Sequence, residues 1–320
     1  MVPTVITSPL QTYEHVLPIL ADAVESDQLR GRLLGIHLEG PFISSQKGAV
    51  GTHPTRFVRA PRSAHAPSSD SSGGVTSGTD LLARWQQLAR GHIRLITIAA
   101  EADGAEALCQ AAIGLGMRVS LGHMMAMGEE IHKLAAHGAT LLTHLGNGCP
   151  NEIHRHRNHL WPALAEDRLS AMLITDGQHL PPDSLTAMLR CKGIGRTIVT
   201  SDAAPVAGLP DGEYECFGGV VYVEGRYVRS ADRSCLAGSG ALMLDCMNHL
   251  SSLNLSAEAG GPPLSLAELM MMGFNNPLRA IGIAPEEFEE KMARAGLPSQ
   301  VLYERGHFRL VGGVYCDPCE

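Results

Sequence analysis

Residues 93–123 read IRLITIAAEADGAEALCQAAIGLGMRVSLGH, and this stretch decides the fold class. The mostly apolar run at 93–99 predicts a strand that is buried on both faces. A helical pattern follows at 104–115, and a second short strand is predicted at 118–121. A strand, a helix and a strand in this order form the βα repeat of a parallel sheet.

The same alternation extends along the chain in both directions. Further strands are predicted at residues 2–7, 33–38, 140–144, 171–175 and 196–200. Helical patterns lie at residues 11–27, 81–89, 127–136, 182–190, 242–253 and 264–272. Because short apolar strands alternate with helices, the expected architecture is an α/β fold, a (β/α)8 TIM-barrel-like structure.

Two kinds of segment interrupt this repetition. Alternating apolar and polar residues predict β-hairpins within 213–234 and 301–311. Residues 61–80 are rich in Ser, Gly, Pro and Ala without periodicity, which predicts a surface insertion. We therefore expect a barrel domain over residues 1–285 and a C-terminal tail over 286–320.

Composition excludes several classes of protein. The 33 acidic residues outnumber the 25 basic ones, the formal charge is -8, and no basic run is long enough to follow a nucleic acid backbone. Eight cysteines without regular spacing are typical of reduced thiols, so a cytoplasmic location is expected. No apolar run reaches the roughly 18 residues that a membrane span needs, so no membrane association is expected.

Polar side chains follow several predicted strands at the point where each strand ends. They are Glu39, His123, His144 and Asp202. The carboxyl ends of barrel strands form the active-site face, so we expect these side chains to lie together. For any one of them alone, an ordinary polar loop residue is the favoured interpretation, but their coincidence on one face favours a site.

Glu39, His123 and His144 form the expected metal site. One carboxylate and two imidazoles from three strands give a divalent ion three protein ligands and leave a position for water, which is the catalytic arrangement. Zinc suits this set of nitrogen and oxygen donors, and iron, cobalt and manganese are the alternatives.

Ordered motifs then make the interpretation more specific. They are HLEGPF at 37–42, GTHP at 51–54, LGH at 121–123, THLGNG at 143–148, DGQH at 176–179, SDA at 201–203 and LAGS at 236–239. In this order they resemble the motifs of N-acetylglucosamine-6-phosphate deacetylases, which are amidohydrolases. The resemblance runs from residue 2 to about residue 283.

The resemblance implies a reaction and a role for each matching residue. The reaction is hydrolysis of N-acetylglucosamine 6-phosphate to acetate and glucosamine 6-phosphate in amino-sugar metabolism. Glu39, His123 and His144 match the metal ligands, Asp202 matches the catalytic aspartate that serves as base and then acid, and His53 matches the histidine that contacts the substrate carbonyl.

Further positions match those around the sugar phosphate: Asn147, the backbone of Gly148, Arg155 and His179. Arg155 offers a planar fork suited to phosphate oxygens, although Arg157 could do the same work. The resemblance also implies a homodimer.

The amino-terminal region departs from the family pattern. Family members begin with β-sandwich strands and a first barrel strand, whereas residues 2–9 resemble the second barrel strand. We therefore expect an N-terminally truncated barrel of seven strands at most, with remnant β-sandwich strands in the tail. The alternatives are an amidohydrolase for another amide, of dihydroorotase or aminoacylase type, and a non-catalytic fragment.

Overall fold

The computed structural model describes residues 1–62, 77–253, 264–295 and 301–311. Contacts between residues divide the chain into two compact units, Met1–Ser170 and Ala171–Glu320. The larger part of the predicted insertion at 61–80 lies outside the described residues.

The first unit is built on parallel strands in chain order. Each of these strands pairs with the next, and the order is β1-β2-β3-β4-β5. Their bounds are β1 Thr4–Ile6, β2 Ile36–Glu39, β3 Ile93–Ile98, β4 Arg118–Leu121 and β5 Leu141–Leu142. All four residues of β2 are buried, as expected for a strand covered on both faces.

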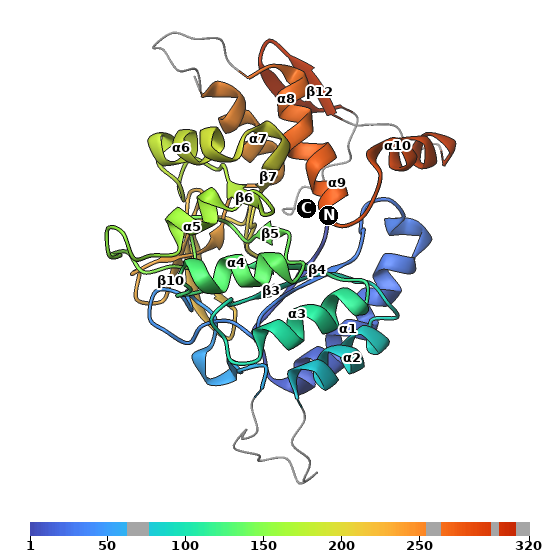
Figure 1. The fold of residues 1–320 in the computed structure, drawn as a ribbon. Coiled ribbons are helices and arrows are strands. Elements are labelled where there is room, and N and C mark those ends of the chain that lie inside the picture. The colour runs from blue at the N-terminus through green and yellow to red at the C-terminus, as the bar shows by residue number, and fades with distance from the viewer. Residues whose placement is uncertain (63–76, 254–263, 296–300, 312–320) are drawn as a thin grey trace. The chain divides into compact units, whose positions relative to one another are not determined.

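Helices connect these strands. Their bounds are α1 Leu10–Glu25, α2 Gly78–Leu88, α3 Ala105–Gly114, α4 Gly128–Ala136 and α5 Leu160–Ala165. Figure 1 shows α1, α2 and α3 side by side in the first unit. Buried Tyr13 of α1 stacks on buried Trp85 of α2, with ring centroids 4.3 Å apart. This aromatic contact joins the two helices over the core.

The second unit combines parallel and antiparallel strands. The strands β6 Ser170–Ile174 and β7 Thr197–Thr200 are parallel. A four-stranded antiparallel sheet has the order β11-β10-β9-β8, and β12 pairs with β13. The bounds are β8 Gly212–Cys216, β9 Gly219–Glu224, β10 Tyr227–Ser230, β11 Leu236–Ser239, β12 Val301–Glu304 and β13 His307–Leu310. The helices are α6 Pro182–Lys192, α7 Met243–Ser252, α8 Leu266–Met270, α9 Asn276–Ala280 and α10 Pro285–Arg294.

These elements confirm the predicted fold class. Seven parallel strands follow in chain order with helices between them, as in a TIM barrel, and both predicted hairpins are present. The sequence patterns did not predict β8, β11, α5 or α10. The division into a barrel and a tail at residue 285, and the origin of β12 and β13 as sandwich remnants, stay predictions.

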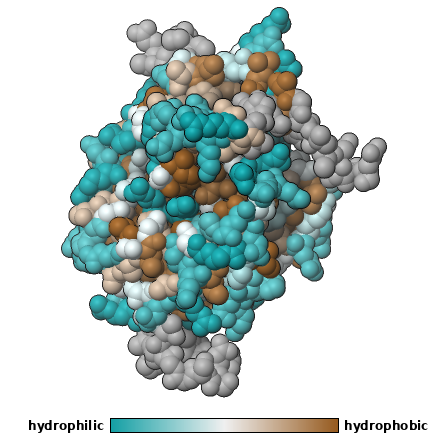
Figure 2. All heavy atoms as spheres, turned by 90° about the vertical axis from the view of Figure 1, so that its right-hand side faces the viewer, coloured by the Kyte–Doolittle hydropathy of each residue, from teal (hydrophilic) through white to brown (hydrophobic). Residues whose placement is uncertain are grey.

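The described surface is mixed in character. On the face that Figure 2 shows, hydrophilic residues cover much of the surface and apolar residues appear between them. Within the described part of the chain, no helix is both long enough and apolar enough to cross a membrane.

Candidate metal centre

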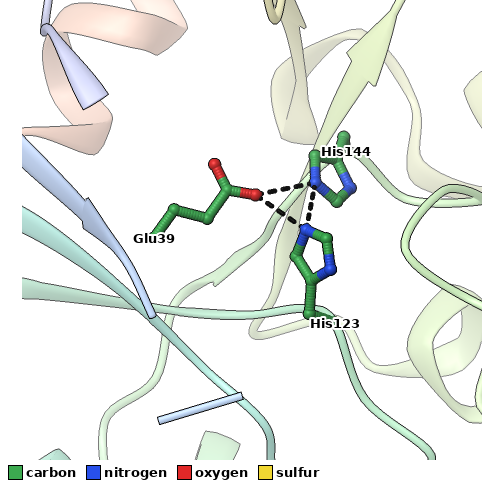
Figure 3. Close-up of side chains that lie close together, drawn as sticks. All are labelled: Glu39, His123 and His144. Atoms are coloured by element: carbon green, nitrogen blue, oxygen red, sulfur yellow. Dashed lines mark hydrogen bonds and ion pairs between the residues drawn. The ribbon is translucent and has the colours of Figure 1, made fainter. Parts of the chain in front are cut away.

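Three strand ends of the first unit position the expected metal ligands. Glu39 is the last residue of β2, His123 lies two residues after β4, and His144 lies two residues after β5. Because parallel strands end at the same edge, the three side chains converge from separate parts of the chain. Figure 3 shows Glu39 facing both imidazole rings. All three residues are buried.

The distances within this cluster are short. Glu39 Oε1 lies 2.8 Å from His123 Nε2 and 2.9 Å from His144 Nε2, and the two Nε2 atoms are 3.0 Å apart. Ligand atoms around one tetrahedral zinc ion lie about 3.3 Å apart when the bonds are about 2.0 Å. The three donor atoms lie somewhat closer together than this, and they converge as the ligands of one small cation do.

The protonation of His123 strengthens this interpretation. Its Nδ1 lies 2.7 Å from the carbonyl oxygen of Ala49, which can only accept, so Nδ1 carries the proton. In the neutral ring, Nε2 then presents a lone pair to the Glu39 carboxylate and to His144. Converging acceptors repel one another unless a proton or a cation lies between them, so the residues present fit a divalent metal ion.

Charge also suits a cation. Burial alone would raise the pKa of Glu39, but the adjoining imidazoles of His123 and His144 lower it well below its usual value. The carboxylate is therefore ionised at neutral pH, as a metal ligand must be.

His53 lies next to Glu39 and His123 of the proposed metal site. Its Nε2 is 3.9 Å from Glu39 Oε1, and its Nδ1 accepts from the backbone N–H of Thr7 at 3.4 Å and lies 3.0 Å from the Thr7 hydroxyl. Burial, and then the nearby His123, lowers the pKa of His53 to about 3, so the ring is neutral. Since Nδ1 accepts, Nε2 carries the proton and can donate toward the cluster.

The loop after β5 approaches the same rings. Gly148 has a positive φ of 57°, and a Cβ there would lie 3.0 Å from both His123 Nδ1 and His144 Cε1. Its backbone therefore comes close to the cluster because no side chain intervenes. Asn147 has a buried Nδ2 that finds no hydrogen-bond partner among the described residues, so this amide can donate to a ligand.

Residues 154–157, which contain Arg155 and Arg157, form an exposed loop that is held by hydrogen bonds within the loop and to Asn158. His154 Nδ1 accepts from the N–H of His156 and of Arg157, and the Asn158 side chain donates to the His154 carbonyl. Arg155 and Arg157 are both exposed, so neither is favoured by burial.

The remaining site candidates belong to the second unit. Asp176 Oδ2 accepts from His179 Nδ1 at 2.8 Å and from Ser239 Oγ at 2.7 Å, and Oδ1 accepts from the His179 N–H at 3.0 Å. The Ser239 N–H donates to the Asp202 carbonyl at 2.7 Å. Ser239 thus connects the residue that orients His179 to the loop that carries Asp202.

Sequence reasoning missed the residues that orient the site. Asp176 and Ser239 stood inside quoted motifs, so a signal for them existed. The contact of Ala49 left no signal, because a backbone carbonyl carries no residue preference, and the Thr7 hydroxyl that lies 3.0 Å from His53 Nδ1 stood outside the quoted motifs.

No protein-family model matches the chain. An N-acetylglucosamine-6-phosphate deacetylase of Bos taurus is 34% identical over 279 residues, which are 85% of this chain and 63% of the relative. An N-acetylgalactosamine-6-phosphate deacetylase of Shewanella is 33% identical over 256 residues, 80% of this chain and 59% of the relative. The chain thus spans about three fifths of the length of these relatives.

A solved structure is similar in fold. It is N-acetyl-D-glucosamine-6-phosphate deacetylase of Mycobacterium smegmatis in complex with N-acetyl-D-glucosamine-6-phosphate. The TM-score is 0.74 at 24% identity, covering 88% of this chain and 67% of that one. At this identity the likeness supports the TIM-barrel-like fold.

Proposed function

Because the chain is a homologue of N-acetylglucosamine-6-phosphate deacetylases, we propose that it hydrolyses the acetamide of N-acetylglucosamine 6-phosphate. The products are acetate and glucosamine 6-phosphate. The observation that carries this proposal is the convergence of Glu39, His123 and His144 at the strand ends, in a chain 34% identical to such an enzyme.

These three residues would hold one divalent ion, with zinc as the first choice and iron, cobalt or manganese as alternatives. When bound, such an ion polarises a carbonyl oxygen and lowers the pKa of a bound water toward about 7. The ionised Glu39 and the lone pair of His123 suit this role.

Asp202 is proposed to transfer the protons, and His53 is proposed to contact the carbonyl oxygen of the substrate's acetamide. Asp202 would accept the proton of the attacking water and then donate it to the leaving amine, which cannot depart as an anion. His53 would donate its Nε2–H to the developing oxyanion, a type of contact worth on the order of 3 kcal/mol when the donor is preorganised. The Thr7 N–H that holds His53 Nδ1 supplies that preorganisation.

The sugar phosphate contacts are proposed at Asn147, the backbone of Gly148, Arg155 and His179. The Asn147 amide, which has no hydrogen-bond partner in the described part of the chain, and the close approach of Gly148 support the first two. His179 is held through Nδ1 by Asp176, so its Nε2 is the atom left for a ligand.

A homodimer and a cytoplasmic location stay predictions, and sedimentation velocity tests the dimer.

A second candidate substrate is the 4-epimer, N-acetylgalactosamine 6-phosphate. The Shewanella relative named for that substrate is 33% identical, close to the 34% of the Bos taurus relative. The same proposed metal ligands and catalytic residues would act on both sugars, because these differ at C4 and the acetamide is on C2.

The test is acetate release from each sugar phosphate by the purified chain with zinc(II). Asp202→Asn is expected to lower kcat by at least about 100-fold, the usual contribution of general acid–base catalysis. The exposed Asp183→Asn is the matched control and keeps full activity. If the folded, zinc-loaded chain releases no acetate from either sugar, the proposed function is wrong.

A further inference from the structure

A line of side-chain hydrogen bonds crosses the first unit one layer below the metal donors, toward the amino ends of the strands. It joins Thr4 Oγ1 to His37 Nδ1 at 3.2 Å and His37 Nε2 to Thr97 Oγ1 at 2.8 Å. It continues from Thr97 Oγ1 to Thr143 Oγ1 at 2.7 Å and ends at Ser120 Oγ, 2.6 Å from Thr143 Oγ1. We call these five side chains the polar ladder.

The polar ladder draws on every strand of the first unit. Thr4 belongs to β1, His37 to β2, Thr97 to β3 and Ser120 to β4, and Thr143 directly follows β5. All but Thr4 are buried. Burying so many polar side chains costs free energy unless each finds a partner, and here each does.

Each metal donor adjoins a member of this ladder. His37 precedes Glu39 by two residues, so both side chains lie on the same face of β2. Thr143 directly precedes His144.

The third donor, His123, is reached through a glycine. A Cβ on Gly122 would lie 2.7 Å from Thr143 Cβ and 3.3 Å from Thr97 Cγ2. The backbone that leads into His123 therefore packs directly on the ladder.

We propose that the polar ladder sets the separation of Glu39, His123 and His144, with Thr97 and Thr143 as positioning residues for the metal site. A core that only needed stability would gain as much from valine, which has the shape of threonine and no polar atom to satisfy. Hydroxyl links between neighbouring strands instead hold the strand ends at defined distances. The inference rests on the proposed function for the presence of a metal ion.

Thr97→Val is the principal test, because it keeps the side-chain shape and removes both hydroxyl links of the central member. Zinc(II) affinity is measured by competition with a chelator, and the visible spectrum of the cobalt(II)-loaded chain reports ligand geometry. Thr97→Val is expected to weaken zinc binding about 10-fold, the low end of the effect of losing a group bonded directly to a ligand, because Thr97 acts through its neighbours, and to shift the cobalt spectrum. Thr97→Ser restores the hydroxyl and should bind zinc within about threefold of the parent.

Thr197→Val is the matched control. Thr197 is also buried on a strand and its hydroxyl donates to the Gly193 carbonyl at 2.9 Å, but it lies in the second unit and outside the ladder. It should leave zinc affinity and the cobalt spectrum unchanged. If Thr97→Val does not fold, Ser120→Ala removes only the last link, and a several-fold weaker affinity is expected.

Parental zinc affinity and an unchanged cobalt spectrum in folded Thr97→Val would overturn the inference, while deacetylation by the parent would stand. Conversely, if the parent binds zinc but releases no acetate, the proposed deacetylase function is wrong. The ladder inference then survives if Thr97→Val still weakens zinc binding. A parent that binds neither zinc(II) nor cobalt(II) overturns both.

Discussion

Backbone strain marks individual residues at the strand ends. His123, His144 and Asp202 have positive φ values of 47°, 27° and 49°. This conformation costs a residue with a Cβ roughly 1–2 kcal/mol. Strain of this kind persists only where the surrounding structure fixes it, and it clusters at functional sites. The surrounding residues therefore hold these three side chains in position. Substituting one surrounding residue at a time tests how much each contributes to the site.

The choice between Arg155 and Arg157 is a prediction about one residue. Arg155→Ala is expected to raise KM for N-acetylglucosamine 6-phosphate about 10- to 100-fold, the effect of losing a charge-assisted hydrogen bond worth about 1.5–3 kcal/mol. The value of kcat should hardly change, because phosphate binding is the same in the ground state and the transition state. Steady-state kinetics of Arg155→Ala beside Arg157→Ala decides, and the reverse pattern would assign the contact to Arg157.

Asp176 makes a prediction about pH. Burial alone would raise its pKa, but hydrogen bonds from His179 and Ser239 outweigh burial and lower it. A lowered folded-state pKa stabilises the protein fully above the unfolded value of about 3.9, and this stabilisation is lost as the pH falls from there toward the folded value. The parent should therefore be more stable than Asp176→Asn at pH 7, and the difference should shrink below about pH 4.

Thermal unfolding of both proteins from pH 7 to pH 2.5 measures this difference. The exposed Asp183→Asn is again the control and should track the parent throughout. A gap between parent and Asp176→Asn that is the same at pH 3 and pH 7 would show that the Asp176 charge does not stabilise the fold.

At the scale of elements, the antiparallel sheet β8–β11 supports the loop that carries Asp202. Its apolar cluster contains Val221, Val223 and Val228 with Ala237 of β11. The next residues of β11 lead to Ser239, whose N–H donates to the Asp202 carbonyl. Ala204, two residues after Asp202, belongs to the same cluster, so the cluster packs directly on the loop that carries Asp202.

Val228→Ala tests that support. Val228 is 0% exposed, so losing two methyl groups should lower the free energy of unfolding by about 2 kcal/mol, including the cavity left behind. Val301→Ala is the same change at a side chain that is 46% exposed and should cost less than about 0.5 kcal/mol. Urea denaturation measures both, and equal losses would mean that the cluster adds nothing beyond an ordinary surface contact.

For the whole molecule, metal binding and stability should be linked. An ion that binds only the folded chain stabilises it by about 2.7 kcal/mol at a concentration 100 times its Kd. Zinc(II) should therefore raise the unfolding midpoint, and a chelator should reverse the rise. Glu39→Gln should lose most of this shift, whereas the exposed Glu289→Gln keeps it. A shift that survives in Glu39→Gln would place the stabilising ion elsewhere.

Much of the fold could be predicted from local patterns. The strand at 118–121 was predicted with the bounds that the structure has, and the turn between β9 and β10 falls inside the predicted hairpin. The short α5 was missed because its six residues, LWPALA, are too few to display a helical period. Outside the described residues the predicted insertion is untested.

The amino-acid order alone indicates which chemical groups stand at the strand ends, because strands that alternate with helices run parallel and end at the same edge of the sheet. It therefore indicated Glu39, His123 and His144 as one set of ligands, and the three do meet. How these groups are held in place is visible only in the folded chain. The Ala49 carbonyl on His123, the Thr7 N–H on His53 and the ladder through Thr97 join residues far apart in the chain. Such contacts depend on strand register and loop path, which no local sequence pattern records.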